Sequence, residues 1–331
     1  MDSQNNIEEP KKKKGPLFFR WLTKDGKGVS KDDAIKIDDY NVKNFFKLYW
    51  RRIRNIIKIN WIYIFGNFPI LALFLAISGN FSHAATAPQS QFYPIVYGMS
   101  TISGNAPVTM PMMGVHAVMG TTTAYSWVDY VLFGVAALVL VTFGLVNTGC
   151  AYLMKNLVRG DHLFLWDDFK STIKQNWKQG LILGILDAVV LALSSYSIYF
   201  YIVNYQTYYI LFYSSLIMMA LYMFIRFYMY TMLVTFELST WKILKNSFIF
   251  ALIGLGKNFL ALIVVIALLG VTFMLSTLFL PLGIIILFML LISTLVYVTT
   301  YMTYPKIKKV MIDPYYPNGE ETDTDTETVE E

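Results

Sequence analysis

The sequence predicts an all-α polytopic membrane protein with six transmembrane helices and amphipathic helices along the cytoplasmic surface. The chain has 331 residues, of which 56% are hydrophobic and 15% charged, whereas soluble domains carry roughly 25% charged residues. Residues 59–128 and 130–154 contain no Asp, Glu, Lys or Arg. Each of these stretches can cross a bilayer, because about 20 apolar residues span its hydrocarbon core.

The two ends of the chain are polar and differ in charge. Residues 1–40 are predicted to form a disordered basic cytoplasmic tail, and residues 311–331 a disordered acidic one. The run Lys11–Lys14 suggests a second interpretation, attraction of the first tail to anionic lipid. Residues 41–310 form the predicted membrane domain.

A basic amphipathic segment opens that domain. Its apolar side chains recur at helical spacing, and they are Phe45, Tyr49, Ile53 and Ile56. Its basic side chains lie on another face, and they are Lys43, Lys47, Arg51, Arg54 and Lys58. This pattern is typical of a helix on the inner membrane surface. It leads into the first predicted span, 59–78, where Pro69 should introduce a kink.

The connection 79–126 is long and uncharged, and we expect an extracytoplasmic loop. Near its end, soft ligands that suit Cu(I) lie close together, namely Met110, Met112, Met113, His116 and Met119. The alternative, which we favour, is an uncharged flap in which methionines fill irregular gaps.

The second predicted span covers 128–154, and a charged turn and a surface helix follow it. One stripe of this helix is apolar and contains Leu165, Phe169, Ile173 and Trp177. Its other side is charged and contains Asp167, Lys170, Lys174 and Lys178. The third span is predicted at 180–201, where Gly180 and Gly184 would allow close approach of another helix.

The remaining spans are predicted at 209–235, 259–278 and 282–301. The turn between the third and fourth spans is rich in tyrosine, which indicates an interfacial aromatic belt or, alternatively, a surface for stacking sugars. Ser239 is a candidate N-cap for a third surface helix, with Trp241, Leu244 and Phe248 on one face. An amphipathic segment therefore precedes a span three times, at Phe45–Lys58, Leu165–Lys178 and Trp241–Lys257.

Basic residues predict the orientation. They occur in 43–58, 155–178, 242–257 and 306–309, whereas the three connections on the opposite side carry none. The positive-inside rule therefore places both termini in the cytoplasm, with six spans.

Two charged residues stand out within the predicted spans. Asp187 follows the start of the third span by about two turns, and Arg226 precedes the end of the fourth by a similar length. An intramembrane charge costs about 3 kcal/mol and is expected to pair or to face water. We predict an Asp187–Arg226 ion pair. It could fix helix packing or lie on a substrate or proton pathway, and the two residues could also make no contact.

The sequence contains none of the common motifs of ATPases and membrane hydrolases, neither a phosphate-binding Gly-rich loop nor a Gly-x-Ser-x-Gly or His-Glu-x-x-His pattern. The single cysteine, Cys150, excludes an internal disulfide and a cysteine-based zinc site. We therefore expect no enzymatic activity, no cofactor and no nucleic-acid partner.

Several short motifs form a recognisable pattern, namely Phe45–Leu48, Phe68–Pro69, Leu157–Gly160, Asp168–Phe169, Gln175–Gln179 and Phe236–Ser239. Together they resemble the YesL-type family of bacterial integral membrane proteins. This chain departs from the family pattern by a longer stretch between Pro69 and Leu157. The resemblance implies a companion of carbohydrate ABC-type uptake systems, with no assigned reaction.

We expect a non-enzymatic accessory or assembly subunit of a membrane complex that includes an ABC permease. The alternative is a small-molecule transporter or channel that uses Asp187 and Arg226. The expected docking surface lies on the inner membrane face and includes Arg51, Arg54, Lys155, Arg159, Asp168, Asn176 and Glu237.

Overall fold

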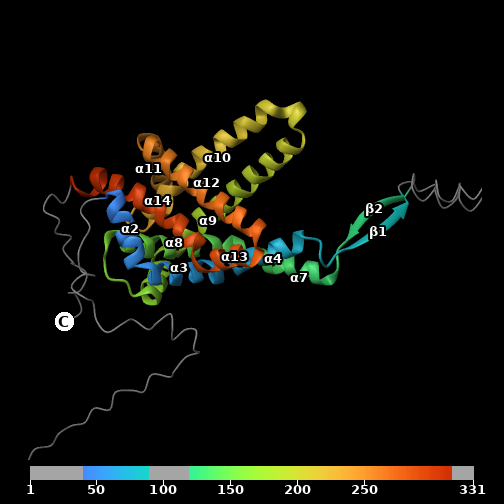
Figure 1. Ribbon diagram of the computed structural model, residues 1–331, viewed down its shortest axis with the longest axis horizontal. Helices are drawn as coiled ribbons and strands as arrows, with labels where there is room; N and C mark the ends of the chain where they lie inside the picture. Colours follow the sequence, from blue (N-terminus) through green and yellow to red (C-terminus); the bar gives the residue numbers. More distant parts are fainter. Residues whose placement is uncertain (1–39, 89–118, 315–331) are drawn as a thin grey trace, which may run out of the picture. The chain divides into compact units, whose positions relative to one another are not determined.

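The computed structural model describes residues 40–88 and 119–314 and is helical apart from one two-stranded β-ribbon (Figure 1). Five helical segments are long and apolar enough to cross a membrane, and a sixth is counted if the pair α3 and α4 forms one span. The predicted fold class, a polytopic helical membrane protein, is confirmed. The described chain forms two compact units, residues 40–66 with 140–314, and residues 67–139.

The larger unit begins with two helices where the sequence predicted one continuous amphipathic stripe. They are α2 (Val42–Arg51) and α3 (Ile53–Gly66), separated at Arg52. The side chain of Arg52 is 8% exposed, and its Nη2 donates a hydrogen bond of 3.0 Å to the carbonyl of Gly160. Gly160 has φ +82°, a conformation that favours glycine and turns the chain after α8. The helix therefore breaks where a basic side chain turns inward.

The second break lies inside the longest helix. Helix α8 (Val139–Arg159) is followed by α9 (Leu165–Val203), which has non-helical backbone angles at Asn176. The predicted surface helix and third span are therefore one helix with a kink. Leu165 and Phe169 are buried, but Trp177, beyond the kink, is 51% exposed, so the predicted apolar stripe ends at Asn176.

The third surface segment is also separated from its span. Helix α10 (Tyr205–Leu233) leads to α11 (Thr240–Ile253) and then, past Gly254, to α12 (Leu255–Leu278). The predicted apolar face of α11 is largely exposed, with Trp241 at 75% and Phe248 at 52%. Ile243 and Phe250 are buried instead. Because this helix has apolar side chains on most of its circumference, periodicity alone did not identify the face that packs.

The last span contains a π-helical segment. It comprises α13 (Leu280–Ile286), the π-helix η2 (Leu287–Leu291), α14 (Ile292–Ile307) and a final π-helical turn η3 (Lys308–Ile312). Asn60 of α3 is fully buried and satisfies the η2 backbone. Its Nδ2 donates to the carbonyls of Leu287 and Phe288 at 3.0 and 2.8 Å, and its Oδ1 accepts from the amide of Ser293 at 3.0 Å.

The larger unit has two buried clusters. One joins α2, α3, α8 and α14 around Leu153, Tyr297 and Tyr304, and the other surrounds α10 and α11 at Tyr228 and Met232. Many large apolar side chains outside these clusters are exposed, as expected of helices that contact lipid rather than water. Tyr205, Tyr208 and Tyr209, at the turn between α9 and α10, are among the exposed side chains.

The smaller unit contains α4 (Phe68–Ile77), β1 (His83–Pro88), β2 (Met119–Ala124) and α7 (Trp127–Ala136). The strands pair antiparallel, with His83 opposite Ala124, so the ends of the predicted loop 79–126 are a β-ribbon. β-Branched Thr121–Thr123 favour this conformation. Pro69 lies in the first turn of α4, where its missing N–H costs nothing. The predicted kink is therefore a helix boundary at Asn67.

A capping box begins α7. Ser126 accepts a hydrogen bond from the amide of Asp129 at 3.4 Å, and the Asp129 carboxylate accepts one from the amide of Ser126 at 2.8 Å. This reciprocal pair satisfies two N–H groups that have no partner within the helix.

Candidate functional site

The structure brings Asp187 of α9 and Arg226 of α10 together. Arg226 Nε lies 3.0 Å from Oδ1 and 2.9 Å from Oδ2 of Asp187. Asp187 is fully buried, and 23% of the Arg226 side chain is exposed. Helices α9 and α10 pack against each other on either side of the turn at Asn204, although Asp187 lies 17 residues before that turn and Arg226 lies 22 residues after it.

Two tyrosines of α10 complete the environment of the carboxylate. Tyr222 donates to Oδ1 at 2.7 Å and Tyr230 donates to Oδ2 at 2.8 Å. A carboxylate offers about four acceptor positions, and Arg226, Tyr222 and Tyr230 together occupy them. The carboxylate of Asp187 is therefore fully engaged within the protein. Tyr222, Arg226 and Tyr230 recur every four residues, so all three project from one face of α10.

Arg226 also lines a cavity of about 220 Å³ among α3, α8, α10, α12 and α14. Arg226 contacts Asp187 through Nε, and its guanidinium carbon lies 5.7 Å from the ring centres of Phe143 and Tyr230. Polar side chains on the cavity wall are Tyr63, Asn147, Tyr230, Thr231, Thr299 and Thr300. The arrangement can hold water or a small molecule that accepts hydrogen bonds.

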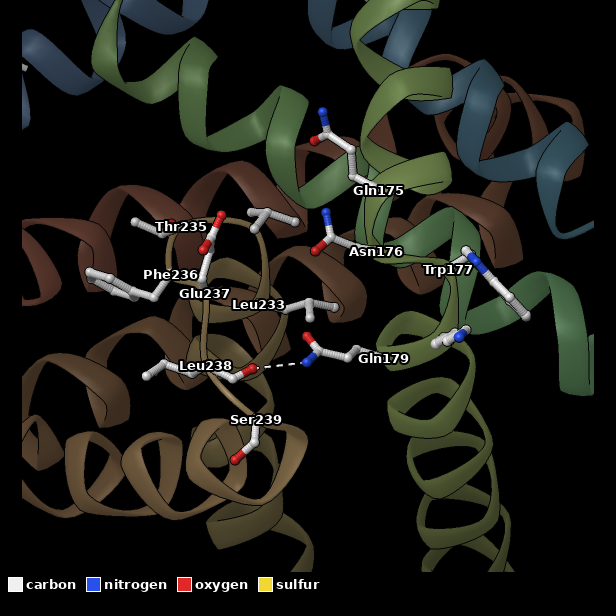
Figure 2. A pocket seen from close by; sticks show the side chains of 12 residues that line it. Gln175, Asn176, Trp177, Gln179, Leu233, Thr235, Phe236, Glu237, Leu238 and Ser239 are labelled. Atoms are coloured by element: carbon white, nitrogen blue, oxygen red, sulfur yellow. Dashed lines mark hydrogen bonds between the residues drawn. The ribbon is translucent and has the colours of Figure 1, made fainter. Parts of the chain in front are cut away.

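A larger polar cleft lies where α9 kinks and where α10 connects to α11. It encloses about 1000 Å³ and is lined by residues 175–179 and 233–239. Figure 2 shows the amides of Gln175, Asn176 and Gln179 pointing from α9 toward the connection that carries Glu237, whereas Trp177 points away. The cleft therefore brings together two motifs that lie far apart in the sequence, Gln175–Gln179 and Phe236–Ser239.

One hydrogen bond joins the two walls of this cleft, and two others link each wall to neighbouring helical segments. Gln179 Nε2 donates to the carbonyl of Leu238 at 2.9 Å, and Lys155 Nζ donates to the carbonyl of Val234 at 3.3 Å. Asn176 Nδ2 donates to the carbonyl of Thr172 at 3.1 Å, beside the kink. Glu237 and Gln175 remain exposed. The cleft thus presents amide groups and a carboxylate on segments that hydrogen bonds hold in place.

The other predicted docking residues divide between structural and exposed positions. Lys155 is 7% exposed, and its ammonium is engaged with Val234, so it presents little surface to a partner. Arg159 pairs with Asp161 at 2.9 Å, and Asp168 accepts a hydrogen bond from the amide of Phe164 at the start of α9. Arg51 is partly exposed and Arg54 is exposed.

The predicted metal ligands are not placed by the structure. Met110, Met112, Met113 and His116 lie outside the described residues, and Met119 belongs to β2, where only the backbone is described. Within residues 40–88 and 119–314, no three of the His, Cys, Asp and Glu side chains come together in a way that could hold a metal ion.

Two features of the site escaped sequence reasoning. The chain has 23 tyrosines, so nothing distinguished Tyr222 and Tyr230 except their spacing of four residues from Arg226. The cleft depends on a contact between segments about 60 residues apart, which no local pattern reveals.

Comparison with known proteins relates part of this chain to a family model. Neither the curated proteins nor the solved structures contain a match to this chain. Residues 123–198, from the end of β2 through most of α9, match the family model described as a protein of unknown function, DUF624. The matched region contains Leu157–Gly160, Asp168–Phe169 and Gln175–Gln179, and this polytopic membrane protein therefore carries a DUF624 region of unknown function.

Proposed function

We propose that this protein is a non-enzymatic accessory subunit of a membrane complex, and that the polar cleft at residues 175–179 and 233–239 receives a polar segment of its partner. The cleft is the observation that carries this proposal. It lies at the end of the bundle where α9 kinks and α10 ends, and the distribution of basic residues favours the cytoplasmic side for that end.

The chemistry of the cleft is suited to binding a peptide. Amide side chains both donate and accept hydrogen bonds, and Glu237 and Lys178 add one charge of each sign. Such groups match main-chain amides and polar side chains of a protein segment. Because Gln179 and Lys155 already fix the walls, little order is lost when a partner binds.

The partner class rests on the resemblance to YesL-type proteins. That family accompanies carbohydrate ABC-type uptake systems, so we propose a sugar permease as the partner. Both segments that line the cleft belong to the motifs that carry the resemblance.

Affinity purification in mild detergent tests this function. We expect the full-length protein to recover permease subunits in stoichiometric amounts. Glu237→Lys reverses an exposed charge in the cleft and should reduce this recovery at least several-fold. Asp167→Lys reverses an exposed charge on the same helix as Gln175 but outside the cleft, and should leave recovery unchanged. Equal recovery by both variants, or no permease with the unmodified protein, would refute the proposal.

The cavity at Arg226 favours a second candidate function, transport of a small polar solute. In proteoliposomes that contain this chain alone, a transporter would produce solute flux. The double variant Asp187→Asn with Arg226→Gln removes both charges and the terminal nitrogens of Arg226. Flux that is present in the unmodified protein and lost in this folded variant would support transport, whereas absence of flux in both would favour the accessory role.

A further inference from the structure

An apolar slot lies beneath α2 at the surface of the larger unit. It has a volume of about 380 Å³ and is lined by side chains of α2, α12 and α14 and by Tyr40. From the geometry and charge of this slot we infer that it binds one acyl chain of an anionic phospholipid, with the phosphate group at Lys257. This site is separate from the polar cleft and does not depend on the function proposed for it.

The slot runs along the length of two antiparallel helices. On α12 it follows Lys257, Leu260 and Val264, while on α14 it follows Pro305, Met302 and Val298. The lining residues of α12 advance by three and then four positions along that helix, and those of α14 go back by three and then four. One residue from each helix therefore lies at each of three successive depths in the slot. Seven residues of helix extend about 10 Å. The slot is therefore an elongated channel that begins at Lys257.

The roof of the slot is the amphipathic helix α2. Val42, Phe45 and Phe46 contribute its apolar wall. Two tyrosines of α14 hold this helix in place, because Tyr297 Oη donates to the carbonyl of Phe45 and Tyr301 Oη donates to the carbonyl of Asn41, each at 2.9 Å. Helix α2, which covers the slot, is thus fixed to α14, which lines its opposite side.

Charge is present at one end only. Among the described residues that line the slot, Lys257 is the sole charged side chain, and it is exposed. Burial raises the pKa of the Tyr40 phenol, so this group adds no negative charge beside it. Helix α2 carries further exposed cations, Lys43 and Lys47. A cation followed by an apolar channel complements an anionic head group followed by an acyl chain.

Lipid retention by the purified full-length protein tests this inference. The delipidated protein is equilibrated with equal amounts of phosphatidylglycerol and phosphatidylcholine that have identical acyl chains, repurified, and its retained lipid quantified by mass spectrometry. We expect several-fold enrichment of phosphatidylglycerol. Lys257→Gln should bring the ratio close to that of the mixture, and Lys257→Arg should restore it. Lys245→Gln removes an exposed lysine of α11 that is not part of the slot and should have no effect.

A second variant addresses the apolar part of the slot. Val264→Trp fills its deep end and should lower the total amount of retained lipid while thermal unfolding stays cooperative. The inference is wrong if the unmodified protein retains both lipids in the ratio supplied, or if Lys257→Gln and Lys245→Gln behave alike.

The segment Leu17–Leu22 in the same chain, which is apolar apart from Arg20, is a competing occupant. If phosphatidylglycerol is retained only after Phe18→Asp with Phe19→Asp, the slot belongs to this segment rather than to lipid, and the inference is overturned.

Discussion

At the scale of single residues, the buried carboxylate of Asp187 determines what its neighbours do. Arg226 balances its charge, and Tyr222 and Tyr230 occupy the acceptor positions that Arg226 leaves. Removing one member of a buried pair leaves an uncompensated charge, which costs more than removing both.

Asp187→Asn should therefore lower the free energy of unfolding by about 3 kcal/mol, at the low end for a buried pair because Arg226 is 23% exposed. The double variant Asp187→Asn with Arg226→Gln should lose much less, since no charge remains unpaired. Unfolding in mixed detergent micelles, followed by circular dichroism, measures both values. A double variant as unstable as the single one would show that the charges do not interact.

The pairing of Asp187 with Arg226 was predictable, because two charges at similar predicted depth on neighbouring antiparallel spans have few other partners. The tyrosines were not, since hydroxyl partners are chosen by rotamer and local packing. The cavity beside Arg226 depends on five helices and lies beyond any local pattern.

At the scale of helices, glycine fixes how closely α8 and α9 approach. A Cβ atom added to Gly184 would lie 2.1 Å from the Cα of Gly144, and one added to Gly180 would lie 2.7 Å from Thr148 Oγ1. The sequence indicated that Gly180 and Gly184 allow close packing, and the structure supplies the partner helix. At Gly184 the obstacle is the backbone of Gly144, so no flexible side chain could move aside, whereas at Gly180 the obstacle is a side chain.

Gly184→Ala should therefore force α8 and α9 apart and cost about 3 kcal/mol, the upper end of the usual range for overpacking. Gly270→Ala, in α12, is the matched control, because an added Cβ there meets no atom within 4 Å. Its stability should be unchanged or slightly higher, since alanine favours helix over glycine. The same unfolding assay compares the two variants, and equal losses would contradict the close approach.

The helix breaks show where sequence periodicity reaches its limit. The sequence predicts three surface segments, each followed by a span. The helix breaks lie at Arg52, Asn176 and Gly254, and these positions depend on contacts distant in sequence or on backbone preference. Arg52 reaches a carbonyl 108 residues away. Periodicity identifies which segments are helical, whereas these contacts decide where each helix ends and which face is buried.

At the scale of the whole molecule, charge is distributed unevenly along the bundle. Lys178 and Lys245 lie on segments rich in lysine, whereas the turns at Asn204 and Phe279 lie on stretches without charge. The composition of the spans predicts membrane insertion, and the positive-inside rule adds an orientation with Lys178 and Lys245 in the cytoplasm. This orientation can be measured directly.

Cysteine labelling provides that measurement, because the one native cysteine, Cys150, is fully buried and should stay unreactive in the folded protein. We expect Asn204→Cys and Phe279→Cys to react with a membrane-impermeant maleimide on intact cells. Lys178→Cys and Lys245→Cys should react only after the membrane is permeabilised. The unmodified protein serves as the control for Cys150. If the two lysine-site variants react on intact cells and the two turn variants are protected, the orientation is the opposite of the predicted one. The polar cleft would then lie outside the cell, where it could not meet a cytoplasmic partner segment.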